Sequence, residues 1–131
     1  MAAAESYPEE LKYHPEHDWA RIEGDEAVVG ITWFAQDALG ELVHFEAPEV
    51  GGTIEKDSSY GEVESVKAVS DVIAPLSGEI LAVNEQVVEA PETVNEDPYG
   101  EGWLLRIRLS DPSEAEALLD VEAYKQVLAD S

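Results

Sequence analysis

Short stretches in which apolar and polar residues alternate follow one another along most of the chain, which is the pattern of half-buried β-strands. Glycine, proline, asparagine and aspartate separate the stretches, as Gly24-Asp25 does between the first two. In the third stretch we expect Val43 and Phe45 to share one face. The alternation predicts strands at residues 18–22, 26–31, 41–46, 60–66, 69–74, 79–84 and 103–109.

Helix signals interrupt this pattern once in the first half of the chain. Thr32 is a good N-cap for a short helix over residues 33–39, because its hydroxyl can accept a free N–H of the first turn. Gly40 follows, and glycine readily adopts the left-handed conformation that ends a helix. We therefore expect a mostly β protein with short helices between the strands.

The C-terminal segment changes to a helical period. Asp111 followed by Pro112 favours a helix start, and Glu114 is expected to reach back and complete the cap. A second helix should begin at Asp120. Its apolar stripe should pack on a sheet, and consists of Val121, Tyr124 and Leu128.

A weak internal repeat is also present. Three short matches recur in order 38 to 40 residues apart: Gly40-Glu41-Leu42 with Gly78-Glu79-Ile80, Thr53 and Asp57 with Thr93 and Asp97, and Tyr60-Gly61-Glu62 with Tyr99-Gly100-Glu101. Two copies of one β unit predict two similar antiparallel sheets packed face to face. The alternative is chance matching in a chain rich in glycine and glutamate.

The length and composition set limits on this picture. A chain of 131 residues with 44% hydrophobic residues is the size of one globular domain, so residues 1–131 are expected to form a single unit. No apolar run is long enough to span a membrane. The N-terminus lacks the basic residues of a targeting segment, so we expect a cytoplasmic protein. Cysteine is absent, which excludes disulfides, thiolate metal sites and a thiol nucleophile of the protein itself.

The charge is strongly unbalanced, with 30 acids against 7 bases and a net charge of −23. Such a surface repels nucleic-acid phosphates and anionic lipids, so neither a nucleic acid nor a membrane is expected as a partner. An ordinary acidic cytoplasmic protein and a protein adapted to high salt both fit this composition.

Lys67 is the main candidate for chemistry, because it lies between two strand-like segments. A hairpin centred there would hold its amine at a rigid, accessible tip, as a modifying enzyme or a swinging arm requires. The pattern alone favours an ordinary surface lysine beside acids, because the hairpin lacks an Asn-Gly turn and its alternation is imperfect.

Other candidates are weaker. His14 and His17 lie near Glu16, but Pro15 separates the histidines and a metal ion needs further converging ligands, so no metal site is predicted. Glu62 and Glu64 could form an acid pair for hydrolysis, although such strand neighbours are usually solvated. No serine stands in a nucleophile-elbow motif and no glycine-rich phosphate loop is present.

The residues around Lys67 resemble the lipoylation motif of glycine cleavage H proteins, and the likeness extends over nearly the whole chain. At the lysine it consists of Glu64-Ser65-Val66-Lys67, Ser70-Asp71, Ala74-Pro75 and Ser77-Gly78-Glu79. Elsewhere it includes Tyr13, His17-Asp18-Trp19, Val29-Gly30-Ile31-Thr32, Ala35-Gln36, Leu39-Gly40, Val94-Asn95, Asp97-Pro98-Tyr99-Gly100-Glu101-Gly102-Trp103 and Leu118-Leu119. Where members of this family often carry an acid and a tyrosine or histidine, this chain has Trp33 and Phe34.

The resemblance implies a barrel-sandwich hybrid fold and a carrier that is not itself an enzyme. Lipoic acid would be attached by an amide to Lys67, with Glu64 and Ser65 as supporting motif residues. The carrier would take an aminomethyl group from a pyridoxal-phosphate glycine decarboxylase to an aminomethyltransferase, and dihydrolipoamide dehydrogenase would reoxidise it. A lipoate-attaching enzyme is a fourth implied partner. The alternative is a related carrier that donates lipoyl groups to other proteins.

A loaded arm would carry an amine, which is cationic at neutral pH, so carboxylates are its natural recipients between partners. Asp71 lies four residues after Lys67 on the outgoing strand. Asp18 lies in the segment that resembles the family's cleft-forming stretch, and Glu16 is two residues before it. We therefore expect Asp18 and Asp71, together with Glu16, to hold the loaded arm.

Overall fold

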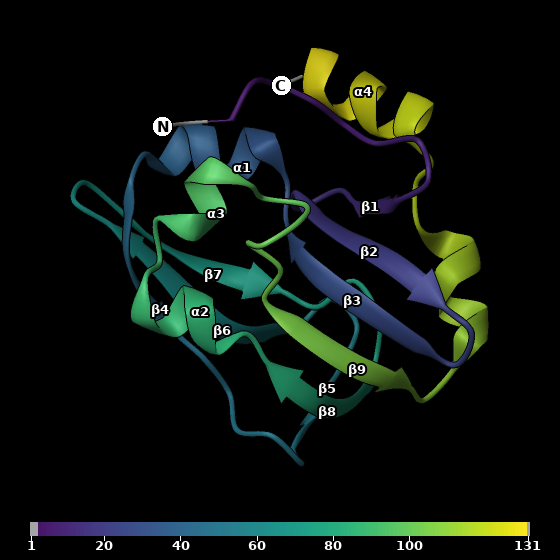
Figure 1. Cartoon of the computed structure of the whole chain (residues 1–131). Helices are drawn as coiled ribbons and strands as arrows, with labels where there is room; N and C mark the ends of the chain where they lie inside the picture. Colours follow the sequence, from purple (N-terminus) through teal and green to yellow (C-terminus); the bar gives the residue numbers. More distant parts are fainter. Residues whose placement is uncertain (1–2, 131) are drawn as a thin grey trace.

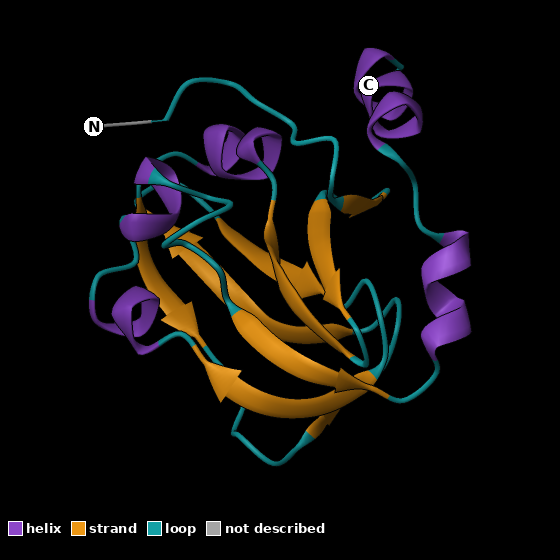
Figure 2. Ribbon diagram, turned by 45° about the vertical axis from the view of Figure 1, so that its right-hand side comes forward, coloured by secondary structure: helices purple, strands orange, loops and turns teal. Residues whose placement is uncertain are grey.

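The computed structural model describes residues 3–130 as two antiparallel sheets with short helices at their edges (Figure 1, Figure 2). The larger sheet has the strand order β1-β2-β3-β9-β8-β5 and the smaller one has the order β4-β6-β7. The strands are β1 (Lys12–His14), β2 (Asp18–Glu23), β3 (Glu26–Ile31), β4 (Leu42–Glu46), β5 (Thr53–Ile54), β6 (Ser59–Ser65), β7 (Val69–Ile73), β8 (Gly78–Val83) and β9 (Leu105–Leu109). The helices are α1 (Trp33–Leu39), α2 (Glu85–Glu89), α3 (Thr93–Glu96), the 3-10 helix η1 (Pro112–Ala117) and α4 (Val121–Ala129).

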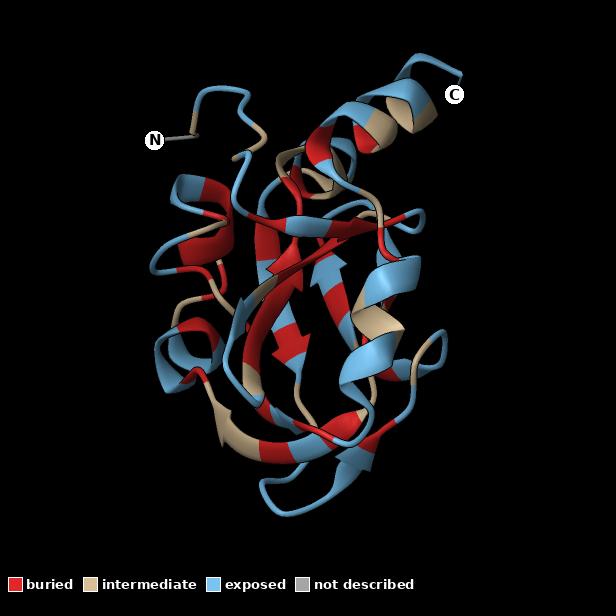
Figure 3. Ribbon diagram, turned by 90° about the vertical axis from the view of Figure 1, so that its right-hand side faces the viewer, coloured by how far each residue is buried: buried red, intermediate tan, exposed pale blue. Residues whose placement is uncertain are grey.

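The main core is formed by the inward residues of both sheets, as strand alternation requires. The larger sheet contributes Val29 and Ile107, and the smaller one contributes Phe45, Val63 and Val72, all of them buried. Figure 3 shows that buried positions are concentrated along the strands. Burial of about 25 cal/mol per Å² of apolar surface makes this core the main source of stability.

A second cluster fixes α4 to the outside of the larger sheet. Val121 and Tyr124 are buried against Tyr13 and Trp19, and Leu128 packs at the edge. The rings of Tyr13 and Tyr124 are stacked with centroids 4.7 Å apart. The apolar stripe expected in this helix is therefore confirmed, and Asp120 caps the helix by accepting the N–H of Ala123 at 2.9 Å.

The caps follow the sequence signals with one correction. The Thr32 hydroxyl accepts the N–H of Ala35, and Gly40 closes α1. After Asp111 the chain forms a 3-10 helix instead of an α-helix. Glu114 does not reach back to the cap, because its carboxylate accepts the N–H and the hydroxyl of Ser77 at 2.7 and 2.9 Å.

The internal repeat is not matched by equivalent structure. The two sheets have six and three strands. Of the repeated threonines, Thr53 lies in β5 whereas Thr93 lies in α3. Of the repeated tyrosines, Tyr60 lies in β6 whereas Tyr99 lies in a turn. Two antiparallel sheets are confirmed, but they are not equal copies of one unit.

The N-terminal segment is bound to the body of the protein through one of the departures from the family pattern. The indole N–H of Trp33 donates to the carbonyl of Ala3 at 2.8 Å, and the Tyr99 hydroxyl donates to the carbonyl of Ser6 at 2.6 Å. Phe34 packs on the ring of His17, with centroids 4.6 Å apart. Within residues 3–130, no helix is long and apolar enough to cross a membrane.

Candidate functional site

Lys67 lies in the turn between β6 and β7, and Val66 and Ala68 beside it are exposed as well. Figure 1 shows this connection standing out from the body of the protein beneath α1. The hairpin predicted from the sequence is therefore present, and its side chain at position 67 is accessible to another protein.

Ser65 fixes the shape of the turn. Its side chain is buried at 4% exposure, and its hydroxyl oxygen accepts the N–H groups of Lys67 and Ala68 at 3.2 and 3.1 Å. The Ser65 N–H donates to the carbonyl of Ala68 at 2.8 Å. A serine side chain thus supplies the acceptor that tightens this turn, which explains how a hairpin forms without an Asn-Gly pair.

The side chain of Lys67 lies along the corner where α1 meets β4. Gly40 forms this corner with φ 86° and ψ −164°, a conformation essentially restricted to glycine. A Cβ atom at Gly40 would lie 3.5 Å from Cε of Lys67. The amine end of the Lys67 side chain therefore lies beside the half-buried backbone of Gly40.

Asn95 holds the same corner in place. Its amide nitrogen donates to the Gly40 carbonyl and to Oε1 of Gln36, both at 2.9 Å, and its Oδ1 accepts the N–H of Leu42 at 2.9 Å. Leu42 is paired with Ser65 across the small sheet. Asn95 is far from Lys67 in the sequence, and apart from its place in the family likeness no pattern indicated this role.

A cavity of about 350 Å³ adjoins the same corner and is lined by residues of α1 and α3 and of the segments beside them. Gly40, Gln36 and Asn95 form part of its wall, and acidic residues form the remainder. The acidic residues that line it are Asp37, Glu41, Glu92 and Glu96.

Asp18 occupies a position that the sequence did not indicate, because its carboxyl is buried at 1% exposure. The backbone N–H of Ile73 in β7 donates to it, while Oδ1 has no hydrogen-bond partner among the described residues. Burial raises the pKa of Asp18 well above its usual range, the Ile73 hydrogen bond opposes that shift, and Glu16 adds to it. Asp18 therefore covers the outer edge of the small sheet beside the strand that carries Asp71.

Tyr60 faces the same buried region. Its hydroxyl also has no hydrogen-bond partner within residues 3–130. Burial raises the pKa of the Tyr60 hydroxyl, and the nearby Asp18 carboxylate raises it further. Most buried polar atoms are hydrogen-bonded, so Asp18 Oδ1 and the Tyr60 hydroxyl are exceptions within the described part of the chain.

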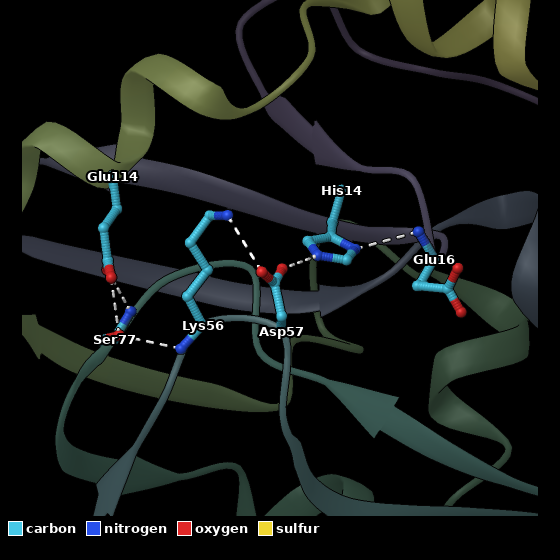
Figure 4. A network of polar contacts seen from close by, with 6 residues as sticks. All are labelled: His14, Glu16, Lys56, Asp57, Ser77 and Glu114. Atoms are coloured by element: carbon cyan, nitrogen blue, oxygen red, sulfur yellow. Dashed lines mark hydrogen bonds and ion pairs between the residues drawn. The ribbon is translucent and has the colours of Figure 1, made fainter.

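Glu16 and Asp71 are exposed. Asp71 points to the outer face of the small sheet, directly opposite Glu62. Figure 4 shows that Glu16 contributes its backbone to a polar network: its N–H donates to Nδ1 of His14 at 3.0 Å. The structure thus places Asp18 at the free edge of β7, Asp71 on the outer face of the same strand, and Glu16 near Asp18.

The histidines have structural partners. Because Nδ1 of His14 accepts an N–H, its Nε2 carries the proton and donates to Oδ1 of Asp57 at 2.7 Å. The hydrogen bond from His14 is the main cause that lowers the pKa of Asp57. Burial of the carboxyl opposes this shift, and the hydrogen bond from the Lys56 ammonium adds to it. Nδ1 of His17 is hydrogen-bonded to the Tyr124 hydroxyl at 2.8 Å. The described residues contain no group of three or more side chains that could hold a metal ion.

Comparison with known proteins gives a consistent result. The sequence family described as glycine cleavage H-protein matches residues 11–131. A glycine cleavage system H protein of Symbiobacterium thermophilum is 52% identical over 117 residues, covering 89% of this chain and 91% of the relative. One of Bacteroides thetaiotaomicron is 53% identical over 123 residues, covering 94% of this chain and 98% of the relative.

A solved structure agrees with this assignment. The crystal structure of a glycine cleavage system H protein from Mycobacterium marinum matches with a TM-score of 0.85 and 40% identity, covering 94% of this chain and 99% of the other. By sequence and by fold, the chain belongs to the glycine cleavage H-protein family.

Proposed function

We propose that this protein is the lipoyl-bearing shuttle of a glycine cleavage system and that lipoic acid is attached by an amide to Lys67. The observation that carries the proposal is the exposed lysine at the tip of a hairpin whose turn is fixed by Ser65. An arm needs a rigid base and a free end, and Lys67 has both. The relatives at 52–53% identity favour the shuttle over a carrier that donates lipoyl groups to other proteins.

The bound lipoyl group would supply a disulfide that accepts two electrons and an aminomethyl group, which the cysteine-free chain cannot do itself. The residues of the chain position the base of the arm. Ser65 holds the turn, and Gly40 leaves room for the lysine side chain at the corner that Asn95 stabilises. The protein thus acts as a co-substrate of other enzymes.

Its partners follow from this role. The aminomethyl group comes from a pyridoxal-phosphate glycine decarboxylase and goes to an aminomethyltransferase, and dihydrolipoamide dehydrogenase restores the disulfide. A fourth enzyme attaches lipoate to Lys67. The bacterial relatives support a cytoplasmic location for the whole cycle.

Between partners, the cationic amine of the cargo is held by carboxylates near β7. Asp71 and Glu16 are exposed, so the amine can reach them without displacing other residues. Asp71 is also flanked by Glu62, and a cation beside it relieves the repulsion between them. Asp18 offers a buried oxygen without a partner, which an amine can reach only when the residues that cover it move.

The attachment is tested by mass spectrometry of the intact protein. Lys67→Arg keeps the charge but cannot form the lipoyl amide, so we expect complete loss of the adduct. Lys56→Arg, at a half-buried lysine, and Lys125→Arg, at an exposed one, are matched controls. Both variants should carry the lipoyl adduct. An adduct on Lys67→Arg, or none on the parent protein in a lipoylating host, contradicts the proposal.

A further inference from the structure

An apolar patch surrounds the base of the arm. It consists of Val43, Val66 and Val69, which are 49%, 83% and 58% exposed, and we call it the tip patch. Val66 adjoins Lys67, and Val69 lies two residues beyond it. Val43 lies at the bulge where β4 leaves its register with Ser65 and Glu64. A bulge turns a side chain out of its alternating place, which is why Val43 is exposed although Phe45 is buried and the two were expected to share a face.

The tip patch is a concentration of exposed apolar surface. Three of the six large hydrophobic side chains that are strongly exposed within residues 3–130 belong to it. None of the three supports the fold by burial. Clustered exposed apolar side chains beside an accessible functional group are typical of an interaction surface.

Carboxylates border the tip patch on the outer face of the small sheet. Glu64 stands opposite both His44 and Val69, and in the next row Glu46, Glu62 and Asp71 lie side by side on the three strands. All four acids are exposed. Strands β4, β6 and β7 contain no lysine or arginine. A partner that covers the valines therefore needs an apolar centre and basic residues around it.

The reach of Lys67 identifies which partner this is. An unmodified lysine extends only about 6 Å from its Cα atom. An enzyme that acts on the bare amine must therefore contact the neighbouring residues of the turn, whereas enzymes that act on the far end of a lipoyl arm need not. Val66 and Val69 lie within about 7 Å of Lys67 along the chain at the rise of extended backbone.

We propose that the tip patch and its acidic border are the docking surface for the enzyme that attaches lipoate to Lys67. This inference rests on the proposed attachment. In the step that the surface serves, the ε-amine attacks the activated carboxyl of the lipoyl donor, an amide forms, the activating group leaves, and the amine loses a proton. The valines bind the apolar part of the enzyme, and the carboxylates bind its basic residues.

The test measures lipoylation kinetics of the full unmodified chain with a purified lipoate–protein ligase, lipoate and ATP. Val66→Ser and Val69→Ser should each raise KM about fivefold, as expected for partial loss of one buried valine contact. The value of kcat should change little, because the amine is untouched. Val50→Ser is the matched control, since Val50 is 60% exposed but lies outside the tip patch.

A second arm tests the acidic border. Glu62→Gln and Glu64→Gln should raise KM and weaken its dependence on ionic strength, whereas Glu122→Gln on α4 should do neither. Binding of the unmodified variants to immobilised ligase should fall in parallel with the rise in KM.

The outcomes separate this inference from the proposed function. A parent protein that gains no lipoyl group contradicts attachment at Lys67. A parent that is lipoylated normally, together with valine variants whose KM equals that of Val50→Ser, overturns the docking surface alone. The docking surface is also overturned if the valine variants lose affinity only for the decarboxylase after lipoylation.

Discussion

Asp18 is an acidic residue at the beginning of a strand, yet its side chain is buried. It begins β2, yet it is 1% exposed because its carboxyl covers the free edge of β7 and accepts the N–H of Ile73. The alternation of apolar and polar residues predicted the strand. Burial of the carboxyl was not predicted, because it depends on β2 and β7, which meet only in the folded chain. Asn95 was missed for the same reason, since its partners Gly40 and Leu42 are more than 50 residues away.

The burial of Asp18 predicts a pH dependence of stability. Because its folded-state pKa lies above the unfolded value of about 3.9, the folded state binds this proton more tightly. Its contribution to the free energy of unfolding is therefore complete at low pH and is lost as pH rises through the folded pKa. Asp18→Asn cannot lose a proton. We expect the stability of this variant relative to the parent to rise above pH 4, by at most about 1.4 kcal/mol per unit between the two pKa values.

Urea unfolding from pH 4 to pH 8 measures this difference. The exposed Asp71→Asn is the control, and its stability relative to the parent should show no comparable trend with pH. A constant difference between parent and Asp18→Asn, or one that falls as pH rises, contradicts the burial of Asp18 as the cause.

The same two residues predict how long the cargo is retained. On the lipoylated, aminomethyl-loaded protein, Asp18→Asn and Asp71→Asn should release ammonia and formaldehyde faster than the parent. A charge-assisted hydrogen bond contributes about 1.5–3 kcal/mol, so we expect the release rate to rise more than about tenfold for buried Asp18. Exposed Asp71 should change the rate by no more than about fivefold. Equal lifetimes for both variants and for Glu122→Gln would falsify these carboxylates as the holding site.

At the level of elements, the long strands and the capped helices could be predicted and the shortest elements could not. Strands of five or more residues show enough alternation to be recognised, and the helices with Thr32 and Asp120 as caps were placed correctly. Strands β1 and β5 have three and two residues, and α2 and α3 have five and four, so neither period can be read from them. Their positions depend on tertiary contacts.

The β6–β7 turn yields a prediction at this scale. Ser65→Ala removes the acceptor of the Lys67 and Ala68 N–H groups, and we expect a loss of about 1 kcal/mol in the free energy of unfolding. The amides of Lys67 and Ala68 should also exchange with solvent faster by NMR. Ser65→Thr keeps the hydroxyl and serves as the control. If Ser65→Ala leaves both amides as slow as in the parent, the hydroxyl does not hold the turn.

For the whole molecule, the dominant feature is the excess of negative charge, 30 acids against 7 bases. Ion pairs with arginine or lysine reach Glu23, Glu26, Asp57 and Glu79, and they lie at partly exposed positions where each contributes little. Seven bases are too few to compensate 30 acids. The sequence predicted the charge but not its arrangement, in which Glu46, Glu62 and Asp71 form one row across the small sheet.

This row turns the general effect of salt into a specific prediction. Like charges directly opposite on neighbouring strands destabilise a sheet, and the Debye length shortens from about 30 Å at 0.01 M to about 8 Å at 0.15 M salt. The melting temperature should therefore climb as NaCl is raised from dilute buffer, by about 3–6 °C for each kcal/mol recovered.

Glu62→Gln removes the middle charge of the row and two repulsions at once. It should raise the melting temperature in dilute buffer and make the rise with salt smaller, whereas Glu122→Gln, on exposed α4, should alter neither as much. Sucrose at equal osmolality controls for effects other than screening. A melting temperature that stays flat with salt in the parent, or a Glu62→Gln variant that matches Glu122→Gln, would mean that repulsion across the small sheet does not limit stability, and an origin in high salt would lose its support.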